Sequence, residues 1–157
     1  MLDTLFLLTF IIPAPFWFFL IFLPNRSITR RLFATSYSHL GFVALGMMYL
    51  FVLVGSVVGI ITAGNFAVSK LTSLAGLTSL ATSPAFVLAM WLHLVTMDLA
   101  GGFYIYRAGQ DMHMGSWALG IIEFFTLLLG PVGILMFAIA RILYGMRKRM
   151  EAAKLEQ

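Results

Sequence analysis

The fold is decided by the stretch 85–107, AFVLAMWLHLVTMDLAGGFYIYR, an apolar segment that nevertheless carries His93 and Asp98. About 20 consecutive apolar residues make a helix long enough to cross the hydrocarbon core of a bilayer, which is about 30 Å thick. A carboxylate placed in that core costs at least about 2.5 kcal/mol on insertion scales. We therefore predict a transmembrane helix over 85–106 whose Asp98 is either paired within a helix bundle or used for function.

The composition excludes an ordinary soluble domain. Of the 157 residues, 61% are hydrophobic and only 10% are charged, and the mean hydropathy is +0.99. A soluble domain is about 25% charged because its surface faces water. The surface of this chain must face lipid, so we predict an all-α, polytopic integral membrane protein that forms a single domain over 1–157.

The apolar segments predict four transmembrane helices, at about 5–23, 39–62, 85–106 and 116–143, followed by a charged tail over 144–157. Pro13 and Pro15 predict a kink in the first helix, because proline removes a backbone donor. Residues 24–37 are interpreted as a polar, basic connection. The less apolar segment 63–84 predicts either a short helix in the membrane interface or a loop.

The charged residues indicate which surroundings the protein contacts. Its net charge of +4 comes mainly from basic clusters at the ends of apolar segments, a pattern typical of contact with phospholipid headgroups. No soluble module with a basic face exists, which excludes nucleic-acid binding. Four crossings would place both termini on one side. The basic residues Arg26, Arg30, Arg31 and Arg107 would then oppose Lys70 and the tail, which assigns no orientation.

Metal and cysteine chemistry have no sequence support. The chain contains no cysteine, which excludes disulfides, thiolate metal sites and cysteine nucleophiles. Neither a His-x-x-x-His nor a Glu-x-x-His spacing occurs, so we predict no metal site.

Three ionisable side chains within the apolar segments, His93, Asp98 and Glu123, are the candidate catalytic residues. His93 and Asp98 are roughly 140° apart on a helix of 100° per residue, but both can face the interior of a bundle. Apolar surroundings disfavour the charged forms of carboxyl and imidazole groups, which suits proton transfer near neutral pH. We predict that Asp98 and His93 are the proton-transfer pair and that Glu123 assists. In the alternative interpretation, His93 and Glu123 only hydrogen-bond between helices.

Small and aromatic residues predict the walls of a ligand site. Gly101 and Gly102 admit a close neighbour or a ligand beside Asp98. Flat aromatic side chains are typical of membrane interfaces, and they also suit a polyene or a tetrapyrrole. The residues that we expect to contact a ligand are Trp17, Trp91, Gly101, Gly102, Tyr104 and Tyr106.

The motif WLHLVTMDL over 91–99, followed by Tyr106 and by GPVGIL over 130–135, resembles the neoxanthin-synthase-like, or abscisic-acid-deficient-four-like, family of plastids and cyanobacteria. The resemblance implies a small four-helix membrane protein of a bacterial inner or thylakoid-type membrane. It also implies a role in xanthophyll chemistry, which in plants is the redox-neutral conversion of violaxanthin to neoxanthin. The residues that match the family pattern are Trp91, His93, Asp98, Tyr106, Pro131 and Gly133.

Two functions from different classes remain open. The first is an enzyme that rearranges or isomerises a carotenoid and requires no cofactor. The second is a non-catalytic subunit of a larger, photosynthetic membrane complex, with bound carotenoid or with chlorophyll held through His93 or His39. A transporter or channel subunit has less support, because the four segments show no internal repeat.

Overall fold

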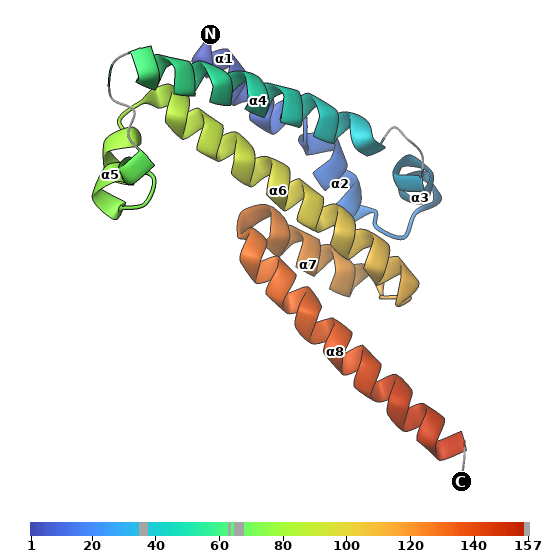
Figure 1. Ribbon diagram of the computed structural model, residues 1–157. Coiled ribbons are helices and arrows are strands. Elements are labelled where there is room, and N and C mark those ends of the chain that lie inside the picture. Colours follow the sequence, from blue (N-terminus) through green and yellow to red (C-terminus); the bar gives the residue numbers. More distant parts are fainter. Residues whose placement is uncertain (35–37, 63, 65–67, 156–157) are drawn as a thin grey trace. The chain divides into compact units, whose positions relative to one another are not determined.

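The computed structural model describes residues 1–34, 38–62, 64 and 68–155, and every regular element in them is a helix (Figure 1). The described helices that are long and apolar enough to cross a membrane are Leu2–Phe22, His39–Thr62, Pro84–Asp111 and Gly130–Met150. The predicted all-α membrane fold with four such helices is confirmed. Many large apolar side chains on these helices are exposed, as a lipid-facing surface requires.

The chain divides into two compact units, Met1–Ala14 with Ser36–Met97 and Pro15–Thr35 with Asp98–Gln157. The division within the first span falls at its two prolines. Helix α1 (Leu2–Ile11) ends before Pro13, and helix α2 (Ala14–Phe22) begins after it. The distortion expected from the prolines is a two-residue break at 12–13, where Ile12 keeps helical angles of φ −65° and ψ −49°. The single domain expected from the sequence stays a prediction.

The first unit contains α1, helix α4 (Ser38–Thr62) and the first half of helix α6 (Pro84–Asp111). Trp91 joins α1 to α6. Its Nε1 donates a hydrogen bond of 3.0 Å to Oγ1 of Thr9. Its ring also lies 6.1 Å from the ring of Phe6 and 5.9 Å from that of Phe10.

The segment between the second and third spans contains a short helix, which is one of the two alternatives predicted from the sequence. Helix α5 (Leu74–Leu80) follows a single 3₁₀ turn, η1 (Val68–Lys70). The Oγ of Ser73 caps α5 by accepting a hydrogen bond of 3.1 Å from the backbone N–H of Gly76. A side chain at Gly76 would overlap the backbone of Lys70, so this glycine allows η1 and α5 to pack closely.

The second unit contains α2, helix α3 (Ser27–Ala34), the second half of α6, helix α7 (Ser116–Leu128) and helix α8 (Gly130–Leu155). Helix α3 lies in the stretch 24–37 that was interpreted as a polar, basic connection, and the structure adds a short helix to that interpretation. Its buried Phe33 packs 4.6 Å from the ring of Phe103 and 5.0 Å from that of Tyr106. Helix α3 is amphipathic, because Phe33 is buried whereas the basic residues of the helix are exposed. This pattern was not recognised in the sequence.

The sequence predicts a fourth span over 116–143 with a hinge at 130–133, and the structure shows two separate helices there. Helix α7 ends at Leu128, and Leu129 adopts φ −147° and ψ 68°, which no helix contains. Pro131 explains the break, because its ring would clash with the carbonyl of Leu127 in a continuous helix and it has no N–H to donate. Helices α7 and α8 form a hairpin instead (Figure 1).

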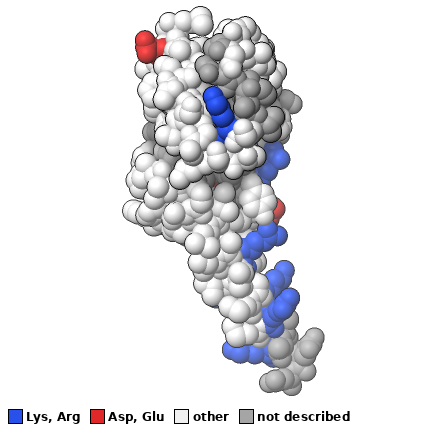
Figure 2. All heavy atoms as spheres, turned by 60° about the vertical axis from the view of Figure 1, so that its left-hand side comes forward, with Lys and Arg blue, Asp and Glu red and all other residues white. Residues whose placement is uncertain are grey.

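The hairpin packs on α6 through glycines, which allow helices to approach closely. Helix α7 runs antiparallel to α6: the contacting pairs are Gly109 with Leu119, Gly102 with Glu123, and Gly101 with Thr126. Helix α8 runs parallel to α6: the contacting pairs are Asp98 with Gly130, Gly101 with Ile134, and Tyr104 with Phe137. On the face shown in Figure 2, Lys and Arg gather along the later part of α8.

Candidate functional site

Glu123 is the most unusual side chain of the second unit. It is 0% exposed, and neither oxygen of its carboxyl group has a hydrogen-bond partner in the described part of the chain. Buried polar groups in proteins are almost always hydrogen-bonded, so an unpartnered carboxyl group points to a functional role. The sequence predicted this residue as an assisting group, but its environment makes it the centre of the site.

Gly102 of α6 lies directly beneath the Glu123 carboxyl. A Cβ atom at this position would lie 2.9 Å from Oε2 of Glu123 and 2.9 Å from Cη2 of Trp17. Trp17 is 4% exposed and therefore shields the carboxyl from lipid. The predicted ligand residues Trp17 and Gly102 are thus brought together with Glu123.

Tyr106 lies one helical turn beyond Gly102 on α6. It is 3% exposed, and its hydroxyl group, like the Glu123 carboxyl, has no hydrogen-bond partner among the described residues. The i, i+4 spacing of Asp98, Gly102 and Tyr106 places all three on one face of α6.

Asp98 lies one turn before Gly102 and is partly buried. Its carboxylate contacts Gly130, the first residue of α8, so closely that a Cβ atom there would overlap Oδ1. The start of a helix carries a partial positive charge, which stabilises a nearby anion. In α8 this is a dipole effect, because Pro131 has no N–H and the N–H groups of Val132 and Gly133 donate to the carbonyl of Leu129. We call Trp17, Asp98, Gly102, Tyr106 and Glu123 the Glu123 cluster.

Gly101 and Tyr104 are less directly connected with this cluster. Gly101 faces the side chains of Ile134 and Thr126, 3.5 and 3.7 Å from the place of a Cβ atom. The hydroxyl of Tyr104 accepts a hydrogen bond of 2.6 Å from Nη1 of Arg141. Both residues therefore join α6 to the hairpin, and their contact with a ligand stays a prediction.

His93 and Trp91 belong to the first unit. His93 is exposed, and its ring lies 5.6 Å from that of Tyr49. In the described part of the chain no hydrogen bond or ion pair joins His93 to Asp98, and the same residues contain no group of three potential metal ligands. Trp91 is occupied with Thr9 and the rings of α1. His93 and Asp98 belong to different units, and their pairing for proton transfer stays a prediction.

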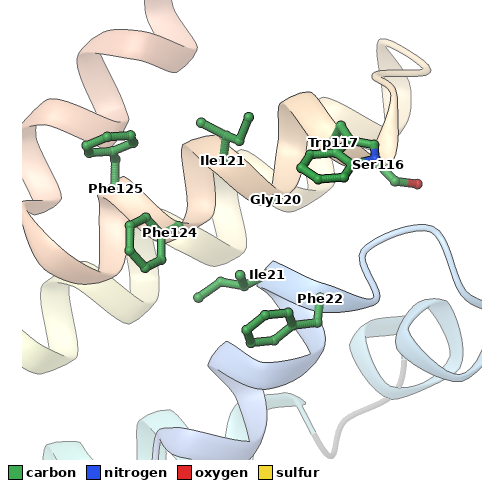
Figure 3. Close-up of a pocket in the computed structure, with 8 residues that line it drawn as sticks. All are labelled: Ile21, Phe22, Ser116, Trp117, Gly120, Ile121, Phe124 and Phe125. Atoms are coloured by element: carbon green, nitrogen blue, oxygen red, sulfur yellow. The ribbon is translucent and has the colours of Figure 1, made fainter.

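An apolar groove of about 410 Å³ runs between α2 and α7. Figure 3 shows Phe22 of α2 facing Trp117 and Phe124 of α7 across it. Gly120 forms its floor, because the carbonyl oxygen of Ile21 lies only 2.5 Å from the place of a Cβ atom. The groove-lining residues are Ile21, Phe22, Ser116, Trp117, Gly120, Ile121, Phe124 and Phe125.

Sequence reasoning missed two residues of the site. Gly130 was interpreted as part of a hinge, whereas it positions the start of α8 against Asp98. Thr126 is fully buried, and its hydroxyl donates a 2.8 Å hydrogen bond to the carbonyl of Ile122. The signal for Gly130 was its place beside Pro131, which is typical of a helix start. Thr126 had no recognisable signal.

The fold and the cluster define a small helical membrane protein with carboxyl groups inside an apolar bundle. The ABA DEFICIENT 4-like family model matches residues 4–137, and the chain belongs to this family. The resemblance inferred from the sequence is thereby confirmed, together with its connection to carotenoid and xanthophyll metabolism. The match includes every residue of the Glu123 cluster. Comparison with curated proteins and with solved structures finds no match.

Proposed function

We propose that the protein catalyses the redox-neutral rearrangement of a xanthophyll epoxide, with Glu123 as the acid and Asp98 as the base. The observation that carries this proposal is the fully buried Glu123 carboxyl without a hydrogen-bond partner in the described residues. The proposal replaces the pair of Asp98 and His93, because His93 is exposed and contacts Tyr49 instead.

The surroundings of the two carboxyl groups differ in a way that supports these roles. Glu123 has no counter-charge within hydrogen-bonding distance in the described residues, and an isolated carboxyl group in apolar surroundings keeps its proton. Asp98 lies at the start of α8, where the helix dipole stabilises an anion. Two carboxyl groups that differ in this way are a common arrangement for an acid and a base.

Their spacing also fits one reaction centre. Glu123 lies over Gly102, and Asp98 precedes Gly102 by one helical turn, a rise of about 6 Å along α6. The hydroxyl of Tyr106, one turn beyond Gly102, is available to hydrogen-bond the oxygen that changes during the reaction.

The steps balance without an oxidant or a reductant. Glu123 donates its proton to the epoxide oxygen as the C–O bond breaks, and the oxygen becomes a hydroxyl group. Asp98 removes a proton from the neighbouring carbon of the polyene, and the electron pair of that C–H bond completes the allene. Proton transfer from Asp98 back to Glu123 restores the starting state, so the product is an isomer of the substrate.

The groove between α2 and α7 supports a long apolar substrate. Its aromatic walls suit a polyene, and its volume of about 410 Å³ accommodates one end of a carotenoid. The remainder of such a molecule would lie in lipid. Gly120 and Phe124 of the groove flank Glu123 along α7.

The test is expression in a host that accumulates violaxanthin, followed by pigment analysis. We expect neoxanthin, or another isomer of the supplied epoxide, with the parent protein. Glu123→Gln and Asp98→Asn should abolish the product, whereas His93→Ala should retain it. Asp111→Asn is the matched control, because Asp111 is an exposed carboxylate at the end of the same helix. Unchanged pigments with every epoxy-carotenoid supplied would contradict the proposal.

The exposure of His93 favours a second candidate, a pigment-holding subunit. An exposed imidazole within a membrane span, beside the ring of Tyr49, could ligate the magnesium of a chlorophyll. Purification in a mild detergent tests this function. A coloured protein that loses its pigment in His93→Ala but not in Glu123→Gln would support it, and a colourless parent protein would count against it.

A further inference from the structure

The first unit contains a pocket that has a different character from the groove beside α7. It encloses about 390 Å³ between α4, α5 and the start of α6. Hydroxyl groups and one ammonium group line it, and among the residues that the structure describes no carboxylate does. The lining residues are Gly55, Ser56, Gly59, Ile60, Lys70, Ser79, Leu80, Thr82, Ser83 and Ala85.

Three hydrogen-bond donors of this pocket come from separate elements. The Lys70 ammonium, from η1, has no hydrogen-bond or ion-pair partner in the described part of the chain. The Ala85 amide lies in the first turn of α6, where N–H groups have no carbonyl acceptor within the helix. The start of this long helix also carries a partial positive charge.

Ser56 of α4 supplies the third donor, and it is the independent sign of a ligand. Its side chain is 3% exposed, and its hydroxyl group has no hydrogen-bond partner among the described residues. A buried hydroxyl group without a partner is costly unless a ligand completes its hydrogen bond. The pocket is thus surrounded by an ammonium group, the start of a helix and a hydroxyl group without a partner among the described residues. These groups suit an anion that has several oxygen atoms.

The pocket continues into an apolar groove. Gly55, Ser56 and Ala85 also line a groove of about 650 Å³ between α1 and α4. Its other lining residues are apolar: Met1, Leu2, Leu5, Met47, Leu50, Phe51, Val52 and Val54. A polar pocket that opens into an apolar groove matches a molecule with an anionic head and a hydrocarbon tail.

We infer that this pocket binds the phosphate group of an anionic phospholipid, with an acyl chain in the adjoining groove. Lys70 and the first turn of α6 contact the phosphate oxygens, and the Ser56 hydroxyl donates a hydrogen bond to it. Gly76 keeps Lys70 in place, because the Lys70 backbone packs directly on this glycine. The site belongs to the first unit and is independent of the chemistry at Glu123.

Native mass spectrometry of the full-length protein measures the affinity. The protein in detergent is titrated separately with dioleoylphosphatidylglycerol, with dioleoylphosphatidylcholine, which has the same acyl chains, and with inorganic phosphate. Both lipids carry the phosphodiester, but the choline ammonium of phosphatidylcholine repels the Lys70 ammonium, so we expect phosphatidylglycerol to bind about tenfold tighter. Equal affinities for the two lipids would overturn the proposal. If inorganic phosphate alone binds as tightly as phosphatidylglycerol, the site takes a soluble anion and the lipid proposal is wrong.

Matched variants test the binding of the lipid headgroup and of the acyl chain separately. Lys70→Gln should weaken phosphatidylglycerol binding about tenfold, whereas Lys148→Gln, at an exposed lysine of α8, should leave it unchanged. Leu50→Trp fills the groove and should weaken both lipids, whereas Leu143→Trp, on the exposed face of α8, should weaken neither. Circular dichroism confirms the fold of each variant. Equal binding by the two lysine variants would contradict the site.

Discussion

The Glu123 carboxyl and Gly102 are in direct contact between α7 and α6, with room for a hydrogen atom but not for a methyl group. A Cβ atom at Gly102 would lie 2.9 Å from Oε2 of Glu123 and 2.9 Å from the Trp17 ring. Because this contact positions the acid and its aromatic cover together, small changes there should affect stability and activity at once.

Gly102→Ala should lower the free energy of unfolding by about 1–3 kcal/mol, because the added methyl group overpacks a buried contact. Thermal unfolding in detergent measures it. Gly46→Ala is the matched control: nothing lies within 4 Å of that position, so stability should be unchanged or slightly higher. Equal effects of the two substitutions would show that the contact at Gly102 is not tight.

Glu123→Met should stabilise the protein while abolishing the proposed activity. A buried polar group without a partner costs about 1–3 kcal/mol, and methionine fills a similar volume without that cost. Denaturation of the variant should therefore require more heat or denaturant. Asp111→Asn, at an exposed carboxylate, should change stability by less than about 0.5 kcal/mol. A destabilised Glu123→Met would mean that the carboxyl makes a favourable interaction in the folded protein.

Gly133→Ala should disrupt the hairpin of α7 and α8. A Cβ atom at Gly133 would lie 2.5 Å from the backbone nitrogen of Thr126, and a backbone atom cannot move aside as a side chain can. We expect a loss of about 1–3 kcal/mol in thermal unfolding. Gly145→Ala, on the same helix with nothing within 4 Å, should have no comparable effect. Similar losses from both would indicate a general sensitivity of α8.

Trp91 and Thr9 should show energetic coupling in a double-mutant cycle. Trp91→Phe and Thr9→Val each remove one partner of the 3.0 Å hydrogen bond. We expect a coupling energy of about 1 kcal/mol, typical of one hydrogen bond in a protein. Strictly additive effects on unfolding would contradict the bond. His93→Ala, on the same helix without a hydrogen bond in the described residues, serves as the uncoupled control.

The spans were predictable because lipid imposes a simple requirement on sequence. A helix that crosses a bilayer must be apolar over its length, and hydropathy alone found the helices around Val52 and Leu92. The break at Leu129 was harder to find, since 116–143 is apolar on both sides of it. Only the steric effect of Pro131 distinguishes a hairpin from a kinked span, and the packing partner decides between them.

The residue types of the site were predictable from the sequence, but which of these residues lie together was not. Asp98, His93 and Glu123 were selected because ionisable groups are rare in spans. Which of them meet depends on the rotation and direction of the partner helix, and no local pattern encodes either. The antiparallel α7 brings Glu123 to Gly102, and the reversal at Leu129 brings Gly130 to Asp98.

The direction of α8 predicts the side of the membrane on which the tail lies. Helix α7 is 13 residues long, about 20 Å, which is shorter than a bilayer core of about 30 Å. Its turn therefore lies at the depth of Asp98, and α8 leaves on the side where α6 ends. The end of α2 is on this side too, since Nδ2 of Asn25 donates a 2.8 Å hydrogen bond to Oγ of Ser116.

The nine Lys and Arg residues of the second unit then lie on one side, which the positive-inside rule predicts to be cytoplasmic. The chain has no cysteine, so single cysteines can be introduced and labelled with an impermeant maleimide. Gly115→Cys and Lys154→Cys should both react from the cytoplasmic side. Labelling of Gly115→Cys and Lys154→Cys from opposite sides would contradict this topology.

The reversal at Leu129 has a consequence for biogenesis. A hairpin that enters and leaves through the same leaflet never moves its strongly basic tail across the membrane. Helix α7 is shorter than a bilayer core, so we expect α7 and α8 to enter the membrane together as a hairpin.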